Sequence, residues 1–354
     1  MRHAANGRAA LRLLIDAVTG KLATDTLAPE TTQALFEAAE RNGVLGLFPL
    51  RHPGYRAAVV AAQARGMRAL RFTHRVVAAI EAAGIPVVVL KGAAAASRWR
   101  EPALRQQSDV DVLVEPRHKD GAAQALVDAG VCSRRFLDSH EMHNDSLLPA
   151  EPSGMLVELH HYFNHHHDTR VEVAELLARR QTVPTPQGDL PALNREDDAV
   201  YLALHAATHS LQRLAWLVDL VGLEPNWQVA AERARAWGVA LAVAPAWRRA
   251  RTALGVPIPQ RAMEIVEAGS IHARLAQVVL EFAEATGGDT QRFFARAFRL
   301  SIVPIRSLPL VFRRKFTAGR EQRDAYELLR RAARQRLGAA RAPQIPFVDG
   351  KESP

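Results

Sequence analysis

The spacing of hydrophobic positions changes along the chain and predicts three successive kinds of structure. Up to about residue 80 the apolar residues recur at helical intervals, and residues 55–83 form a long, alanine-rich stretch without proline. Between residues 85 and 160 the apolar residues form short runs rich in β-branched side chains, which are typical of strands. From Asp197 almost to Leu337 the helical spacing returns, interrupted by prolines.

The middle region predicts several short strands. A continuous apolar run at 85–90 and an alternating run at 109–114 have the length and composition of strands. Further strands are expected at 131–137, 145–148 and 155–160. Between the first strands, a helix start is expected at 93–97 and a helix at 119–129.

These patterns predict an α+β fold, a mixed β-sheet core flanked by N-terminal helices and a large C-terminal helical region. Residues 182–193 contain three prolines and a glycine, and they predict a turn-rich connector at the end of the core. The last residues also contain three prolines and are expected to be loose. The expected parts are a helical region at 1–80, the core at 81–193, a C-terminal helical domain at 194–341 and a flexible tail at 342–354.

Composition indicates a globular protein of a reducing compartment. The chain has 354 residues, of which 48% are hydrophobic, so a sizeable core can form. Cys132 is the only cysteine, which excludes a disulfide within the chain. The first residues lack the apolar run of a secretory signal, and the apolar stretches are too short or too interrupted by arginine to span a bilayer. We therefore expect a cytoplasmic protein with no membrane partner.

The formal net charge is +9, and nearly all of the basic charge is arginine. Abundant arginine together with abundant alanine is typical of a GC-rich coding sequence. A basic face for an anionic partner is the alternative explanation. No RNA-binding signature accompanies the charge, so a nucleic acid partner remains an open but less favoured alternative.

The most informative motif is the Asp-x-Asp pair inside the run 109–114. Side chains alternate along a strand, so Asp109 and Asp111 share one face while Val110 and Val112 point into a core. Two like charges on one face repel each other unless a cation lies between them. Such a pair suits Mg²⁺ or Mn²⁺, which brings a phosphate substrate. The alternative is a solvated face of an edge strand.

Two further segments add to this motif. Lys91-Gly92 follows the strand at 85–90 and precedes a helix start, so it could form an anion-binding turn or an ordinary turn. Glu158 lies in a strand-like run and shares a face with His160. With Asp109 and Asp111, Glu158 would complete a cluster of three carboxylates. Its alternative is a surface position on an edge strand.

Leu-Lys-Gly at 90–92, the Asp-x-Asp run at 108–114 and Glu-Leu-His at 158–160 together resemble the nucleotidyltransferase superfamily. They resemble more narrowly a bacterial group of nucleotidyltransferase family proteins that shares these three segments. The resemblance covers roughly residues 70–225. It implies a nucleotidyltransferase-like catalytic core at 81–193.

The resemblance also implies roles for individual residues. The turn at Lys91 and Gly92 would bind the triphosphate of an NTP, the expected substrate. Asp109, Asp111 and Glu158 would be the catalytic residues and would hold the metal ions, with Glu158 as a metal ligand or a general base.

Two residues of the preceding loop are phosphate-binding candidates. The resemblance implies that Arg105 contacts a phosphate, and a guanidinium suits that contact. In so arginine-rich a chain, a solvated loop arginine is the alternative. Ser108 would either bond a phosphate or cap the strand. His160 is expected near the same cleft.

A polar face recurs at helical spacing within 198–223, which we expect to be one helix. At about 100° per residue its polar members fall within roughly 120° of arc, opposite an apolar stripe. We interpret this face as the far wall of the cleft, where the tryptophan stacks on a base or a substrate ring, the arginine holds phosphate and the aspartate orients a histidine or the substrate. The alternative is a packing surface between domains with a satisfied polar network. The residues of this face are His205, His209, Arg213, Trp216 and Asp219.

A histidine-rich segment raises the possibility of a zinc site. It comprises His160-His161 and the run from His165 to Asp168. A zinc site needs ligands that converge at fixed geometry, whereas consecutive histidines on one segment diverge. We therefore favour an exposed loop, with His160 alone near the cleft.

The function that these observations favour is Mg²⁺-dependent nucleotide transfer. A nucleoside monophosphate would move from an NTP, with ATP expected, to a hydroxyl or phosphate of an acceptor. The acceptor could be a small molecule, a peptide, a protein side chain or an RNA end, and peptide or natural-product tailoring is one setting. Two alternatives remain: a catalytically silent module that binds a nucleotide, RNA or a protein, and a small-molecule kinase that uses the same metal site.

Overall fold

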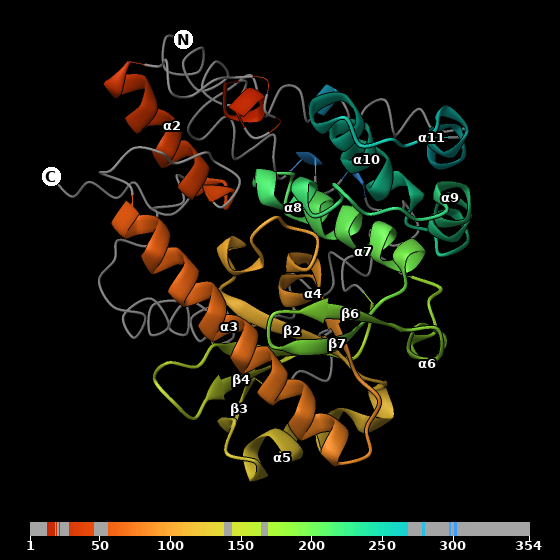
Figure 1. The fold of residues 1–354 in the computed structure, drawn as a ribbon. Coiled ribbons are helices and arrows are strands. Elements are labelled where there is room, and N and C mark those ends of the chain that lie inside the picture. The colour runs from red at the N-terminus through yellow and green to blue at the C-terminus, as the bar shows by residue number, and fades with distance from the viewer. Residues whose placement is uncertain are drawn as a thin grey trace, which may run out of the picture.

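The structure of this chain is a computed structural model (Figure 1). It shows a central β-sheet with helices on both sides. The expected tail at 342–354 and the helical region beyond residue 302 lie outside the described residues. The structure describes residues 13–17, 19, 21, 28–45, 56–137, 144–163, 169–267, 278–279, 297–298 and 301–302.

Seven strands form one mixed sheet in the order β3-β4-β5-β2-β1-β7-β6. β2 pairs with β5 and β1 pairs with β7 in parallel, while the other neighbours are antiparallel. The α+β character and the strands expected between residues 85 and 160 are confirmed, with shifts of a few residues at their ends. The strands are β1 Val88–Leu90, β2 Asp109–Leu113, β3 Cys132–Leu137, β4 Asn144–Pro149, β5 Leu156–His160, β6 Gln181–Thr185 and β7 Gly188–Ala192.

The prediction of a turn-rich connector at 182–193 is wrong, because this segment forms the hairpin β6–β7 and extends the sheet. Val183 and Leu190 lie opposite each other and are both buried. Pro184 is tolerated because β6 is the edge strand of the described sheet, where a missing N–H removes no bond to a further strand. Buried residues such as Val183 and Leu190 have more exposed neighbours along each strand, as expected of a strand with one buried face. The prolines in the sequence hid this pattern.

The helices cover both faces of the sheet. α3 and α5 pack on one face and α7 on the other, and Figure 1 shows α7 to α11 gathered together. Among the described residues, no helix is long and apolar enough to cross a membrane. The named helices are α2 Pro29–Arg41, α3 Arg56–Ala82, α4 Gly92–Ala96, α5 Lys119–Asp128, α6 Val173–Ala178, α7 Arg195–Thr208, α8 Leu214–Val218, α9 Trp227–Ala236, α10 Ala240–Leu254 and α11 Gln260–Glu267, with short 3-10 helices at Pro102–Leu104 and Pro116–His118.

The alternation of side chains in the central strands sends them into two separate hydrophobic clusters. Val88 packs in the cluster that contains α7, whereas Val89 and Val110 pack in the cluster that contains α3 and α5. Asp109 and Asp111 alternate with Val110 along β2, so they face α7. The apolar side of the Asp-x-Asp strand is therefore buried, as its sequence predicted.

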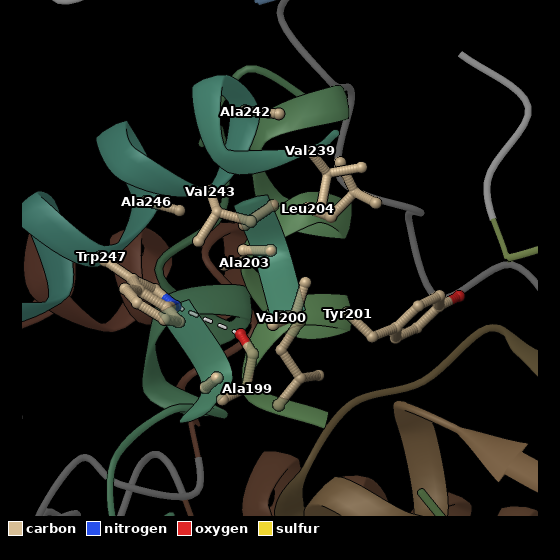
Figure 2. Packing of buried hydrophobic residues seen from close by; sticks show 14 of the residues in the cluster. Ala199, Val200, Tyr201, Ala203, Leu204, Val239, Ala242, Val243, Ala246 and Trp247 are labelled. Atoms are coloured by element: carbon tan, nitrogen blue, oxygen red, sulfur yellow. Dashed lines mark hydrogen bonds between the residues drawn. The ribbon is translucent and has the colours of Figure 1, made fainter. Parts of the chain in front are cut away.

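The packing of α7 on α10 fixes which side of α7 faces the sheet. Trp247 of α10 is fully buried, and its indole N–H donates to the carbonyl of Ala199 at 3.2 Å (Figure 2). In Figure 2 the side chain of Tyr201 points from α7 to the side away from Trp247. Since residues four apart lie on the same helix face, His205 follows Tyr201 away from α10.

The expectation of one helix over 198–223 is also wrong, since α7 ends at Thr208 and α8 begins at Leu214. Ser210 and Leu211 have φ values of 56° and 52°, in the left-handed region. Their N–H groups donate to carbonyls of α7, that of Ser210 to Ala207 and that of Leu211 to Ala206. This pattern is a Schellman helix end. The sequence concealed it because serine occupies the position where glycine is usual.

α3 is part of the packing around the sheet, although its sequence lies mostly in the expected helical region 1–80. The division into four parts stays a prediction. Gly66 of α3 lies against the 3-10 helix Pro102–Leu104, and a Cβ built there would overlap the carbonyl oxygen of Ala103. This close approach fixes the loop that leads to Arg105 and β2.

We predict that Gly66→Ala lowers the free energy of unfolding by about 2 kcal/mol or more, because backbone must move to admit the methyl group. Urea unfolding followed by circular dichroism measures the change. Gly121→Ala in α5 is the matched control, because its added Cβ would meet only the side-chain methyl of Ile85, at 3.3 Å. Equal stability of wild type and Gly66→Ala would contradict the close approach.

Candidate active site

Three neighbouring strands bring charged residues to the face that α7 covers. β2 and β5 run parallel with Asp111 opposite Glu158. On the other side of β2, Asp111 lies opposite Leu90, the last residue of β1, and Lys91 follows directly. The register of these strands, and not proximity in sequence, assembles the site.

Lys91 and His160 both contact the carboxylate of Asp111. Lys91 Nζ lies 2.6 Å from Asp111 Oδ2 and 3.7 Å from Asp109 Oδ1. His160 Nε2 lies 2.9 Å from Asp111 Oδ1 and 3.7 Å from Glu158 Oε2. Each oxygen of Asp111 therefore faces a basic group, and the same two groups approach the other two carboxylates.

The site is buried at Asp111 and more open at its edges. The side chain of Asp111 is 1% exposed, while those of Glu158 and Asp109 are 16% and 28% exposed. Burial alone would raise the pKa of Asp111, but Lys91 and His160 outweigh it and hold that pKa well below its usual range. Burial and the neighbouring carboxylates raise the pKa of Asp109 to about 6, although Lys91 opposes this.

The carboxylates also act on the two basic groups. Burial alone would lower the pKa of His160, but its hydrogen bond to Asp111 and the charge of Glu158 raise it to about 9. Asp109, Asp111 and Glu158 likewise overcome the burial of Lys91 and raise its pKa. At neutral pH the three carboxylates are therefore partly balanced by two cations of the chain itself.

The donor set fits a divalent metal ion. Carboxylate oxygens of Asp111 and Glu158 and a ring nitrogen of His160 lie within 4.8 Å of one another. Because His160 is protonated at neutral pH, the two carboxylates are the metal ligands that this group offers there. Asp109, on the same strand face, adds a carboxylate at the more exposed edge. Carboxylate oxygens are the ligands that Mg²⁺ and Mn²⁺ prefer.

The turn that follows β1 has a strained backbone. Lys91 has φ 47° and ψ −143°, and Gly92 has φ 49°. A lysine in this region is uncommon and persists only where its surroundings enforce it. The turn places the Lys91 side chain beside the carboxylates of β2.

Arg105 and Asp219, two of the expected ligand-binding residues, bind each other. The guanidinium of Arg105 donates from Nε to Asp219 Oδ1 at 2.8 Å and from its Nη2 to Oδ2. Trp99 donates its indole N–H to the same Oδ1 at 3.0 Å. Burial alone would lower the pKa of Arg105, but Asp219 raises it, so the group stays charged. The partner that Asp219 orients in the structure is therefore Arg105, and both side chains are buried.

Arg98 strengthens this connection between the loop before β2 and the helices. It donates to the backbone carbonyl of Asp219 at 3.1 and 3.2 Å and lies 3.0 Å from Asp198 of α7. The sequence did not single out Arg98, Trp99 or Asp198. An arginine next to a tryptophan in a loop follows no sequence pattern that indicates a function. These residues can be identified only from the partners that they contact in the fold.

The remaining polar residues of 198–223 converge around Trp216. The ring centroids of His205 and His209 lie 5.3 and 5.0 Å from that of Trp216 and 4.7 Å from each other. The guanidinium of Arg213 lies over the Trp216 ring at 5.8 Å from its centroid. The helix break, and not a single helix face, brings these side chains together.

This aromatic cluster lies within electrostatic reach of the carboxylate site. Burial, Lys91 and His209 together lower the pKa of His205 well below its ordinary value. Burial and the charge of Asp111 raise the pKa of Tyr201, whose ring stacks on His205 at 6.3 Å. Tyr201 is a further residue that the sequence did not single out, because it reads as one more apolar position of a buried helix.

The other candidates are placed as follows. Ser108 is exposed directly before β2. His161 is buried beside His160, with its ring 5.0 Å from that of Tyr162. The run from His165 to Asp168 lies outside the described residues, so its expected loop structure stays a prediction.

Comparison with known protein families identifies the class to which this chain belongs. The family model described as uncharacterised nucleotidyltransferase matches residues 30–255. The chain belongs to this family. Neither the curated proteins nor the solved structures gave a match to it. The matched segment contains β1 to β7 and the helices that carry the aromatic cluster.

We predict that Asp219→Ala lowers the free energy of unfolding by about 3 kcal/mol, because it leaves the buried charge of Arg105 without its partner. The double variant Arg105→Met/Asp219→Leu should recover much of this loss. Urea unfolding measures both. Glu37→Ala removes an exposed pair with Arg41 and should change stability by less than about 0.5 kcal/mol. A loss for Asp219→Ala as small as that of this control would contradict the buried pair.

We predict that the titration of His205 makes the free energy of unfolding depend on pH. Its pKa is lowered in the folded chain from an ordinary 6.5, so the unfolded chain binds the proton first and stability falls as the pH drops below about 6.5. Between pH 6.5 and 5 the free energy of unfolding of the wild type should fall by about 1 kcal/mol more than that of His205→Gln. Denaturant titrations at several pH values test this, and parallel pH profiles would count against it.

Proposed function

We propose that the protein is a Mg²⁺- or Mn²⁺-dependent nucleotidyltransferase that uses ATP as its NTP substrate. The observation that carries the proposal is the register of β2 against β5, which sets Asp111 opposite Glu158 with Lys91 beside them. Membership of the nucleotidyltransferase family supports the same reaction class. The acceptor is a hydroxyl or phosphate of a small molecule, peptide, protein or RNA end.

The carboxylates of Asp109, Asp111 and Glu158 would hold the metal. A bound divalent ion neutralises charge on the transferring phosphate and its leaving group. An oxygen of the acceptor forms a bond to the α-phosphorus, the bond from that phosphorus to the bridging oxygen breaks, and pyrophosphate leaves. When the acceptor is a hydroxyl, Glu158 is either a third metal ligand or the base that takes its proton.

The residues around the cluster would bind the nucleotide. Lys91 supplies a point charge for the triphosphate at the strained turn with Gly92. Trp216, with His205 and His209 against its ring, offers an aromatic surface on which a base stacks.

Two arginines complete the nucleotide-binding surface that we propose. Arg213 lies at the aromatic surface and would contact phosphate. Arg105, already held by Asp219, contributes positive potential near Asp109 and Asp111. Arg105 thus acts mainly through its field, which differs from the direct phosphate contact that the sequence suggested.

One observation favours a second candidate, a catalytically silent nucleotide-binding module. Lys91 and His160 already balance much of the negative charge of the carboxylates. A site compensated in this way can persist for structural reasons, without a metal. Such a module would bind MgATP and release no pyrophosphate.

Radiolabel transfer tests the proposal. The protein is incubated with Mg²⁺, α-labelled ATP and pools of small-molecule, peptide and RNA acceptors. We expect label to reach an acceptor, and we expect Asp109→Asn and Asp111→Asn to reduce the rate at least about a hundredfold. Asp120→Asn, which removes an exposed carboxylate of α5, is the matched control and should leave the rate unchanged.

Parallel reactions with γ-labelled ATP separate nucleotide transfer from kinase activity. Transfer of the γ-label alone would show that the protein transfers a phosphoryl group and not a nucleotide. MgATP binding without release of pyrophosphate would favour the silent module. Equal rates for the wild type and both aspartate variants would refute catalysis at this site.

A further inference from the structure

Lys91 occupies the space between the two carboxylates of β2. Its ammonium lies 2.6 Å from Asp111 and 3.7 Å from Asp109, and its side chain is only 12% exposed. The other oxygen of Asp111 is engaged by His160. A metal ion that uses the Oδ2 of Asp111 would therefore bring its charge against that of the ammonium, and the repulsion between them would be strong at such short range.

The attachment of Lys91 allows its charge to move without a change in the fold. The backbone of Lys91 is held at the end of β1 by the strained turn, whereas its four-carbon side chain has rotatable bonds. Its charge also acts on His205 of α7, so the ammonium is within electrostatic range of that helix. Asp109, whose side chain is 28% exposed, marks the more open edge of the cluster next to the ammonium.

We propose that Lys91 is an exchangeable counter-cation that competes with free divalent metal for Asp109 and Asp111 and moves to the triphosphate when metal enters with nucleotide. The proposal rests on the proposed function and specifies how that site is controlled. Free metal must displace a cation that then has no anionic partner. A metal–nucleotide complex supplies that partner, because its phosphates receive the ammonium. The site therefore selects the complex over the free ion.

The exchange predicts that one substitution changes two affinities in opposite directions, that for free metal and that for the metal–nucleotide complex. Lys91→Met keeps the unbranched side chain and the same backbone, and it removes only the charge. Without the ammonium, free Mn²⁺ should bind at least about tenfold more tightly, because one repulsion is lost. Mn²⁺ with a non-hydrolysable ATP analogue should bind about tenfold more weakly, because one phosphate contact is lost. A lysine that only stabilised the fold would not shift the two affinities in opposite directions.

The experiment measures both affinities on the full chain: that of free Mn²⁺ from the loss of its electron paramagnetic resonance signal, and that of the Mn²⁺–analogue complex from isothermal titration calorimetry. Lys21→Met is the control, since Lys21 is exposed and its loss removes the same net charge. We expect this control to match the wild type in both measurements. Lys91→Gln is the second variant, and it should reproduce both shifts if Lys91→Met folds poorly by circular dichroism.

Two outcomes separate a failure of the exchange from a failure of the proposed function. If the wild type binds Mn²⁺ and the Lys91 variants bind free Mn²⁺ equally or more weakly, the exchange is overturned while the metal site stands. If no variant binds Mn²⁺ with or without the analogue, or if Asp111→Asn changes nothing, the metal site fails and both proposals fall.

Discussion

The parallel pairing of β2 with β5 is the constraint on which the rest of the site depends. It sets Asp111 opposite Glu158 on the face that α7 covers. Carboxylates held this close in a largely buried place repel each other, so the surrounding structure must supply positive charge. Lys91 from the end of β1 and His160 from β5 supply it, and each contacts a different oxygen of Asp111. The charge balance of the cluster thus follows from strand register.

The helical part completes the site through a second buried set of polar contacts. Asp219, after α8, binds Arg105 and Trp99 of the loop before β2, while Arg98 connects the same region to α7. These contacts hold the loop that delivers Asp109 against the helices that carry Trp216. The interruption between α7 and α8 then gathers the histidines around that tryptophan. The carboxylate cluster and the aromatic surface are therefore parts of one arrangement.

Sequence patterns predicted the parts of this protein that depend on local alternation. The strand face of Asp109 and Asp111 followed from period-two spacing, because apolar neighbours define the buried side. The β6–β7 hairpin was missed because Pro184 signals a turn more strongly than short alternation signals a strand. The end of α7 was missed because Ser210 adopts a left-handed conformation without glycine. The pairing of Arg105 with Asp219 joins residues 114 positions apart, and no local pattern encodes it.

The central claim is that the carboxylates of β2 and β5 form a metal site for a nucleotide. The most direct measurement is anomalous scattering from crystals grown with Mn²⁺ and a non-hydrolysable ATP analogue. The account predicts a manganese peak within about 2.5 Å of carboxylate oxygens of Asp111 and Glu158, with the triphosphate beside Lys91. A nucleotide bound elsewhere, or no manganese at these carboxylates, would contradict it.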